Sequence, residues 1–371
     1  MSRINTNISS LVATRVLGAN NRSLSRSLER LSTGLRINSG KDDPSGLIAS
    51  ETLRSSKRAI TAALDNANRA DNIVAVAEGG LSEVNSLLLE LEDLVDRSAN
   101  TAGLSADEVS ANQLQIDSIL QSITRISGSV SFGDKKLLNG DLAFNLSGVT
   151  ASQISNVQVN AARIAAGSSR TVVVDVVTSA QNAALSYTSG TLTDNVTIQV
   201  RGNHGTDVFS FISGTTISSI ADSINTSTQL TGVSASVSGG NITINSTGYG
   251  RDALVSIEAL SGAFDVSGGS DGNLDYGVDP TVTINGTNAV IKNGLTASVR
   301  TGSLSVDLTL AAGFATQVGT DGTFAITGGG AVFSLSPEVG LAGQESLGLQ
   351  SVAAGSLGNG TDGFLASLGS G

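Results

Sequence analysis

The chain has no cysteine and no tryptophan, only one histidine, and few aromatic residues, which make up 3% of its 371 positions. Without cysteine, the sequence excludes disulfides, thiolate metal sites and a catalytic thiol. The single histidine, His204, can join no His-rich metal cluster and no Cys–His pair, and its place in Arg201-Gly-Asn-His-Gly205 predicts a hairpin turn. Stability must therefore come from packing alone.

Targeting and membrane segments are also missing from the sequence. The N-terminus shows no charged region followed by an apolar stretch and no small-residue cleavage site, so no secretory signal peptide is visible. No apolar run approaches the roughly 20 residues of a membrane-spanning helix. The net charge of −11, and the lack of aromatic residues between the N-terminal arginines, argue against nucleic-acid binding. Taken alone, these absences would indicate a cytoplasmic protein.

Chemical motifs give little support to catalysis. The sequence contains no phosphate-binding glycine loop, nucleophile elbow or zinc signature. Four residues have the spacing of positions one, three, five and nine of a calcium loop: Asp271, Asn273, Asp275 and Asp279. Tyr276 and Val282 stand where that loop requires Gly and a bidentate Glu, so the segment is interpreted as an acidic interdomain loop. We expect no enzyme activity, no metal and no cofactor.

The N-terminal 140 residues carry a helical pattern instead. Apolar residues recur at spacings of three and four in three segments, within 24–35, 74–95 and 109–126. The seam positions are Leu24, Leu28, Leu31 and Leu35 in the first segment, Leu81, Val84, Leu88, Leu91 and Val95 in the second, and Ile116, Ile119, Ile123 and Ile126 in the third. Long narrow seams favour helices that pack lengthwise on other helices over an ordinary helical bundle. Ser105 or Asp107 is the expected cap of the third helix.

A short polar turn joins the first two helices. Gly34 and Gly40 can take the positive φ that ends a helix. Asp43 can cap the second helix, and Pro44 suits its first position, where no backbone donor is needed. The adjacent charges of this turn are explained by capping rather than by acid–base chemistry.

After residue 140 the chain becomes acidic, glycine-rich and β-prone. Residues 171–177 form a continuous β-branched run, suited to a strand buried on both faces or to a sheet centre. Three similar strands, 195–200, 241–245 and 281–285, suggest a recurring hairpin module. Isoleucines at helical spacing in 216–225 predict a helix that crosses a small sheet.

These patterns predict an α+β multidomain fold, with a long N-terminal helical, coiled-coil-like bundle followed by β-rich outer domains. The expected parts are 1–43, an inner helix and turn; 44–140, a helical core domain; 141–275, a β-rich outer domain with the hairpin–helix module; 276–345, a second β-rich outer segment; and 346–371, a return segment.

Several stretches resemble the N-terminal region of bacterial flagellins. They are Ile4-Asn-Thr-Asn-Ile8, the turn within 28–54, Ser98-Ala-Asn100 and Phe132-Gly-Asp-Lys-Lys-Leu-Leu-Asn-Gly140. Residues 214–226 resemble, less specifically, the module inserted in the outer domains of flagellins and hook-associated proteins.

The resemblance implies a structural subunit that polymerises with further copies into the flagellar filament for swimming motility. It also implies an extracellular location, reached without a cleaved signal peptide through the type III export apparatus with an export chaperone, and contact with cap and hook-associated proteins. No nucleic acid and no membrane is implied as a partner. Flagellins pair terminal helices from both chain ends, and no such helix precedes Gly371, so a longer parent protein is expected.

Two alternatives stay open at this point. A hook–filament junction protein shares the helical ends and the Asp-Asp-Pro turn, and an enzyme carried on a flagellin scaffold would need a catalytic set in the outer region.

The resemblance also bears on host recognition. Flagellins detected by the vertebrate innate receptor carry an Arg and a Glu where this chain aligns Glu90 and Gln115, while Leu94 is retained. The reversed charge predicts weak receptor activation.

Overall fold

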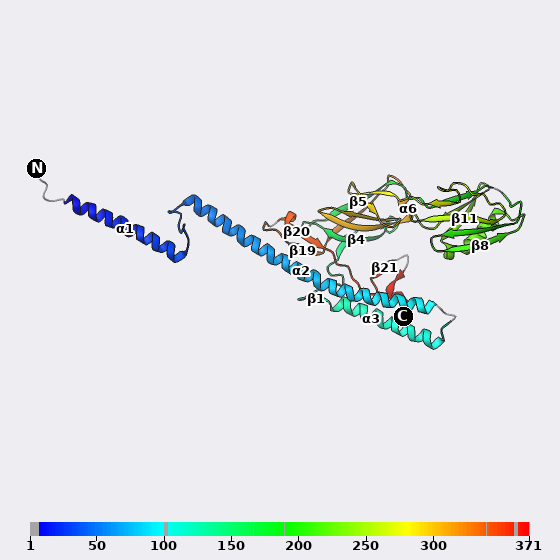
Figure 1. Ribbon diagram of the computed structural model, residues 1–371, viewed down its shortest axis with the longest axis horizontal. Coiled ribbons are helices and arrows are strands. Elements are labelled where there is room, and N and C mark those ends of the chain that lie inside the picture. The colour runs from blue at the N-terminus through cyan, green and yellow to red at the C-terminus, as the bar shows by residue number, and fades with distance from the viewer. Residues whose placement is uncertain are drawn as a thin grey trace. The chain divides into compact units, whose positions relative to one another are not determined.

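The computed structural model describes residues 7–99, 103–165, 167–188, 190–338, 340–359 and 363–370. By its internal contacts the chain divides into two units, one comprising Met1–Asn68 with Ser334–Gly343 and the other Arg69–Phe333 with Gln344–Gly371. Long helices followed by many antiparallel strands confirm the predicted α+β class (Figure 1). None of the helices in the described ranges is both long and apolar enough to cross a membrane.

Three long helices open the chain: α1 (Ile8–Thr33), α2 (Pro44–Ala99) and α3 (Ala106–Ser129). The Asn7 side chain accepts a hydrogen bond from the Ser10 amide and starts α1. Of the two caps considered for α3, the structure uses Ser105, which exchanges hydrogen bonds with Glu108 in a capping box. Local polar residues thus determine where α1 and α3 begin.

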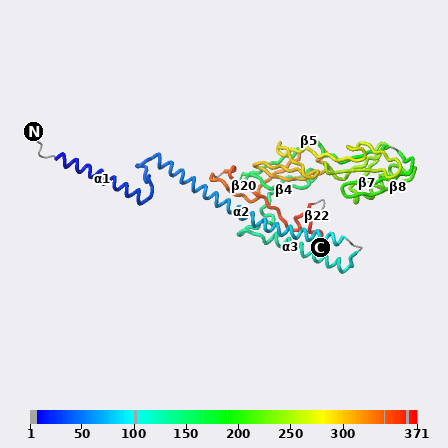
Figure 2. Tube along the Cα trace, in the orientation of Figure 1, coloured from blue at the N-terminus to red at the C-terminus, as the bar shows by residue number. Residues whose placement is uncertain are grey.

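The second half of α2 packs lengthwise on α3. Their shared core consists of Val84, Leu91, Leu94, Ile116, Ile119, Leu120 and Ile123, together with Ala354 from the return segment. The Gln113 side chain donates a hydrogen bond to the Leu368 carbonyl over 2.8 Å. The C-terminal part of the chain therefore runs back onto the helices, as the red trace beside α3 shows (Figure 2).

A smaller core joins α2 to the segment that follows α3. There β1 (Ser131–Phe132) and β2 (Lys135–Lys136) pair as an antiparallel hairpin. Ala77 of α2 is buried with Leu137 and Leu138. Close approach is possible because Gly80 has no side chain, and a Cβ there would lie 2.8 Å from both Leu138 Cδ1 and Val130 Cγ2.

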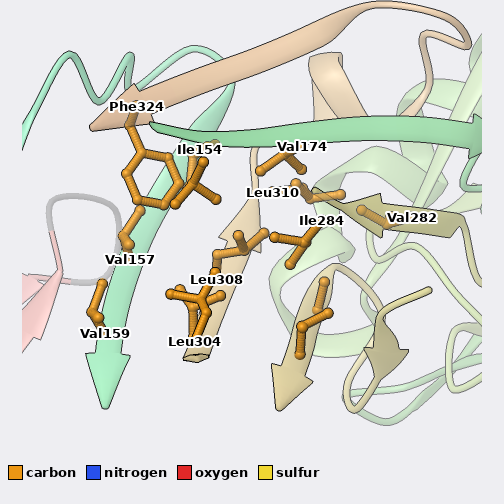
Figure 3. Close-up of a cluster of buried hydrophobic side chains, with 14 of the residues drawn as sticks. Ile154, Val157, Val159, Val174, Val282, Ile284, Leu304, Leu308, Leu310 and Phe324 are labelled. Atoms are coloured by element: carbon orange, nitrogen blue, oxygen red, sulfur yellow. The ribbon is translucent and has the colours of Figure 1, made fainter. Parts of the chain in front are cut away.

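The first β domain is built from two antiparallel sheets. Their strand orders are β14-β13-β5-β18-β3 and β15-β16-β17-β4. The strands are β3 (Phe144–Ser147), β4 (Ile154–Ala162), β5 (Arg170–Thr178), β13 (Thr281–Ile284), β14 (Thr287–Asn288), β15 (Val290–Ile291), β16 (Thr296–Arg300), β17 (Leu304–Leu310) and β18 (Asp321–Gly329), with the short helix α6 (Ala312–Ala315) before β18. Inward-facing side chains from both sheets form one core (Figure 3).

Strand β5 lies within its sheet, between β13 and β18, as the β-branched run 171–177 predicts for a sheet centre. Only one of its faces is buried. Val172, Val174 and Val176 are inaccessible, whereas Asp175 is only half-buried. The run is therefore a one-sided strand, because the other side of the sheet is not covered by a second layer.

A second β domain is inserted between β5 and β13. It contains the sheets β6-β10-β9 and β12-β11-β7-β8. Its elements are β6 (Ala184–Tyr187), β7 (Val196–Gly202), β8 (Thr206–Phe211), α4 (Ile217–Thr226), α5 (Thr228–Thr231), β9 (Val233–Ser238), β10 (Asn241–Ser246), β11 (Leu254–Ser261) and β12 (Leu274–Tyr276). The α4 helix buries Ile217, Ile220 and Ile224 in this core, as the isoleucine spacing predicts.

The outer domains are nested rather than consecutive. The core of the second lies within residues 183–266, while strands on both sides of that insertion build the first. The three similar strands, β7, β10 and β13, lie in three different sheets, although each belongs to a hairpin. The remaining elements are β19 (Ala331–Ser334), η1 (Leu341–Gly343), β20 (Gln344–Leu347), β21 (Gly358–Asn359), β22 (Gly363–Phe364) and η2 (Leu365–Leu368).

Two neighbouring glycines of α2 give a matched test of the helical packing. Nothing lies within 4 Å of a Cβ built on Gly79, whereas one on Gly80 meets Leu138 and Val130. Gly79→Ala should stabilise the helix by up to about 1 kcal/mol, since alanine is the better helix former. Gly80→Ala should destabilise the protein by about 1–3 kcal/mol through overpacking. Thermal unfolding measures both, and equal melting temperatures would contradict the packing described.

Candidate assembly surface on the helices

The first helix has an apolar face with no partner among the described residues. None of its 26 residues is buried. The seam predicted from the sequence lies on the surface: Leu24, Leu28 and Leu31 are 58%, 55% and 82% exposed, and Leu35, just after the helix, is 45% exposed. A helix in water is stabilised mainly by burying such a face, so this face is suited to an intermolecular or long-range partner.

The turn after α1 positions the start of α2. Gly34 ends α1 in the left-handed conformation, with φ +69°. Gly40 does not take positive φ, so only one of the two glycines acts in this way. Asp43 Oδ1 accepts a hydrogen bond from the Gly46 amide over 2.9 Å, and Pro44 is the first residue of α2.

Gly46 is a turn residue that the sequence reasoning missed. A Cβ at this position would lie 2.5 Å from Asp43 Oδ2 and 2.6 Å from Ile37 Cδ1. Glycine therefore lets the capping carboxylate and the turn pack against the first turn of the helix. The available signal was a glycine two residues after Pro44, since glycine is otherwise unfavourable inside helices.

The seams of α2 and α3 are divided between core and surface. Val84, Leu91, Ile116, Ile119 and Ile123 are buried, and Leu88 and Ile126 pack against the same core at partial burial. Leu81 and Val95 remain exposed. Fewer seam positions are buried than the periodicity predicts, because α3 covers only one side of α2. Leu94, which is not one of the predicted seam positions, lies on that covered side.

The carboxylate at the start of α3 is held in its charged form. Hydrogen bonds from the backbone and side chain of Ser105 lower the pKa of Glu108, and they outweigh the small effect of burial. A charged carboxylate in the first turn also complements the positive end of the helix dipole.

The residues aligned with the receptor contacts interact with one another. The Gln115 side chain donates a hydrogen bond to Glu90 Oε1 over 3.2 Å, and both residues are exposed. Leu94 is only 5% exposed, so it is a core residue in this chain. The exposed surface between α2 and α3 therefore carries a hydrogen-bonded pair of one acidic side chain, Glu90, and one neutral side chain, Gln115.

Two carboxylates of the segment considered for calcium are used within the protein. Asp275 accepts hydrogen bonds from the Ala184 and Ser270 amides, at 2.8 Å and 3.0 Å. Asp279 accepts one from the Arg251 amide at 2.8 Å. His204 lies in the turn between β7 and β8, in agreement with the hairpin prediction.

Comparison with known proteins identifies the helical part. The family model of the bacterial flagellin N-terminal helical region matches residues 4–143. Residues 4–143 are thus similar to the helical region of bacterial flagellins. The model of the flagellin hook IN motif matches residues 188–248, which contain β7 to β10 with α4 and α5.

Curated relatives of the flagellin region include two from Vibrio. Flagellin E of Vibrio cholerae is 42% identical over 137 residues, and polar flagellin F of Vibrio parahaemolyticus is 41% identical over the same length. In both cases the match covers 37% of this chain and 36% of the relative. The matched region thus spans about a third of the relatives' length.

Solved structures give a weaker likeness. The D2-D3 domains of the flagellar cap protein FliD from Escherichia coli share 16% identity, with coverage of 50% of this chain and 98% of that chain. The TM-score is 0.32, which is too low to establish a common fold.

The turn before α2 is testable through its glycine. Gly46→Ala should displace the Asp43 cap and cost about 1–2 kcal/mol, the order of a lost N-cap. Gly18→Ala is a control, because nothing lies within 4 Å of a Cβ there and alanine favours the helix. Amide hydrogen exchange of residues 45–48 should accelerate in Gly46→Ala alone; unchanged exchange would show that the cap tolerates a side chain.

Proposed function

We propose that this chain belongs to a structural subunit that polymerises into the bacterial flagellar filament for swimming. The observation that carries the proposal is the exposed apolar seam of α1, located within a flagellin helical region. A 26-residue amphipathic helix that shares no core with the other described residues is expected to bury that face in an assembly.

The partners follow from the same proposal. Other copies of the subunit build the filament, with α1 innermost and the β domains outward. The subunit is extracellular and is exported without a cleaved signal peptide by the type III apparatus, with its chaperone. It meets the cap and hook-associated proteins at the ends of the filament. Its role is structural rather than catalytic.

The relatives favour this role over the hook–filament junction. The two Vibrio relatives described above are named flagellins, although the outer region carries a motif named for the hook. The two roles differ when the gene is deleted. Loss of a filament subunit removes the filament protein itself, whereas loss of a junction protein releases unassembled flagellin into the medium.

The seam is tested with a double variant of the protein expressed from its own gene. Leu24→Asp/Leu28→Asp places two charges in the proposed interface. Each unpaired buried charge should destabilise the assembly by several kcal/mol. Filaments and swimming should be lost. Ser23→Asp/Ser27→Asp is the matched control, because it adds the same charges outside the seam. Normal filaments from the Leu24/Leu28 variant, seen by electron microscopy, would refute the assembly role.

Host recognition is a separate proposal. The Glu90 carboxylate, hydrogen-bonded to Gln115, presents negative charge where receptor-detected flagellins carry an Arg. A reversed charge at an interface can cost several kcal/mol. We expect weak receptor activation by the monomeric protein in reporter cells and a gain with Glu90→Arg. Activation at the potency of receptor-detected flagellins would contradict this expectation; Glu83→Arg controls for net charge.

A further inference from the structure

Two connecting segments join the two β domains. They are residues 179–183, between β5 and β6, and residues 277–280, between β12 and β13. The Gln181 amide donates a hydrogen bond to the Val278 carbonyl over 2.9 Å, and the Val278 amide donates one to the Gln181 carbonyl over 3.0 Å. We name these two segments the hinge, because two domains with separate cores and a narrow connection are expected to move relative to each other.

A loop of the second β domain, between β10 and β11, contacts both the hinge and the first β domain. Tyr249 of this loop packs at partial burial against the apolar core of the first β domain. The Gly250 amide donates a hydrogen bond to the Gln181 carbonyl of the hinge over 3.1 Å. The Arg251 amide donates one to Asp279 Oδ1 over 2.8 Å, and Arg251 Nε pairs with Asp279 Oδ2 over 3.3 Å. We name Tyr249, Gly250 and Arg251 the latch.

Glycine makes the contact between these segments possible. A Cβ on Gly250 would lie 2.5 Å from the Cα of Gly294, which belongs to the β15–β16 loop of the first β domain. A Cβ on Gly294 would lie 2.5 Å from the Tyr249 carbonyl oxygen. A Cβ on Gly277 would lie 2.5 Å from the carbonyl oxygens of both Gln181 and Gly250. The latch, the hinge and the β15–β16 loop therefore meet backbone to backbone, at a distance that a side chain would not allow.

We propose that the latch locks the hinge, so that the two β domains move as one rigid body. Bending at the hinge would change the separation of Gly250 and Gly294, whose backbones are already in contact. It would also break the hydrogen bond of the Gly250 amide and withdraw Tyr249 from the first β domain. The second β domain is thus a fixed extension of the first. This lock operates within one chain and does not require assembly.

Distance measurement between two spin labels tests the lock. The chain has no cysteine, so labels attach only to cysteines that are introduced. Ser238→Cys lies at the turn between β9 and β10, and Gly302→Cys lies in the turn between β16 and β17. Both positions are exposed, and each is separated from the contact at Gly250 and Gly294 by the length of a strand. Double electron–electron resonance on the purified chain should give one narrow distance distribution.

Two latch variants should release the hinge. Tyr249→Ala/Arg251→Ala removes the interdomain side-chain contacts and should roughly double the width of the distribution. Gly250→Ala should act in the same way, because its Cβ does not fit beside Gly294. Gly214→Ala is the matched control. Its φ of +85° is close to the +87° of Gly250, but nothing lies within 4 Å of a Cβ there, so the distribution should stay narrow.

Circular dichroism and thermal unfolding check that each variant is folded. Arg251→Ala alone, which changes a side chain that is 65% exposed, replaces any latch variant that is not. Three results would overturn the proposal: a broad distribution in the parent, a narrow one in every folded latch variant, or equal broadening in Gly214→Ala. None of them involves filaments, so each would leave the proposed filament function standing, which the seam variant tests separately.

Discussion

Lengthwise packing of apolar helix faces is the interaction on which the helical part of the molecule depends. Between α2 and α3 it is satisfied within the chain, by a buried stripe that runs from Val84 to Leu94 on one helix and from Ile116 to Ile123 on the other. On α1 the same type of face remains unburied. Because burial of apolar area supplies most of the stability of such helices, the unburied face is the strongest physical reason to propose assembly.

Charge is distributed unevenly along the helices of the larger unit. Arg69 and Lys135 border an apolar groove, while Glu92, Asp93 and Asp96 surround an exposed leucine. Exposed pairs of this kind add little to the stability of a monomer.

The β domains differ from α1 in burying their apolar side chains within the chain. Each closes its own apolar core, one between two facing sheets and the other between sheets covered by α4. The apolar cores of both β domains are thus closed within the chain, in contrast to the apolar face of α1.

The sequence by itself determined the elements whose signals are local. Seam spacing located the three helices, Pro44 and Asp43 marked the start of α2, and the β-branched run 171–177 indicated a central strand. The short motifs in the first 140 residues were sufficient to indicate the flagellin resemblance, because turns and helix caps are encoded by neighbouring residues.

Only the tertiary structure decided which seam residues are buried and how the outer strands are combined. Leu81 and Val95 follow the periodicity yet stay exposed, while Leu94 is buried, because the side of α2 that α3 covers is not encoded in spacing. The nesting of one β domain within the other and the close approach of Asp43 and Ile37 to Gly46 both depend on contacts between residues far apart in sequence or across a turn. Such contacts carry no local periodicity, since they arise only when the chain has folded.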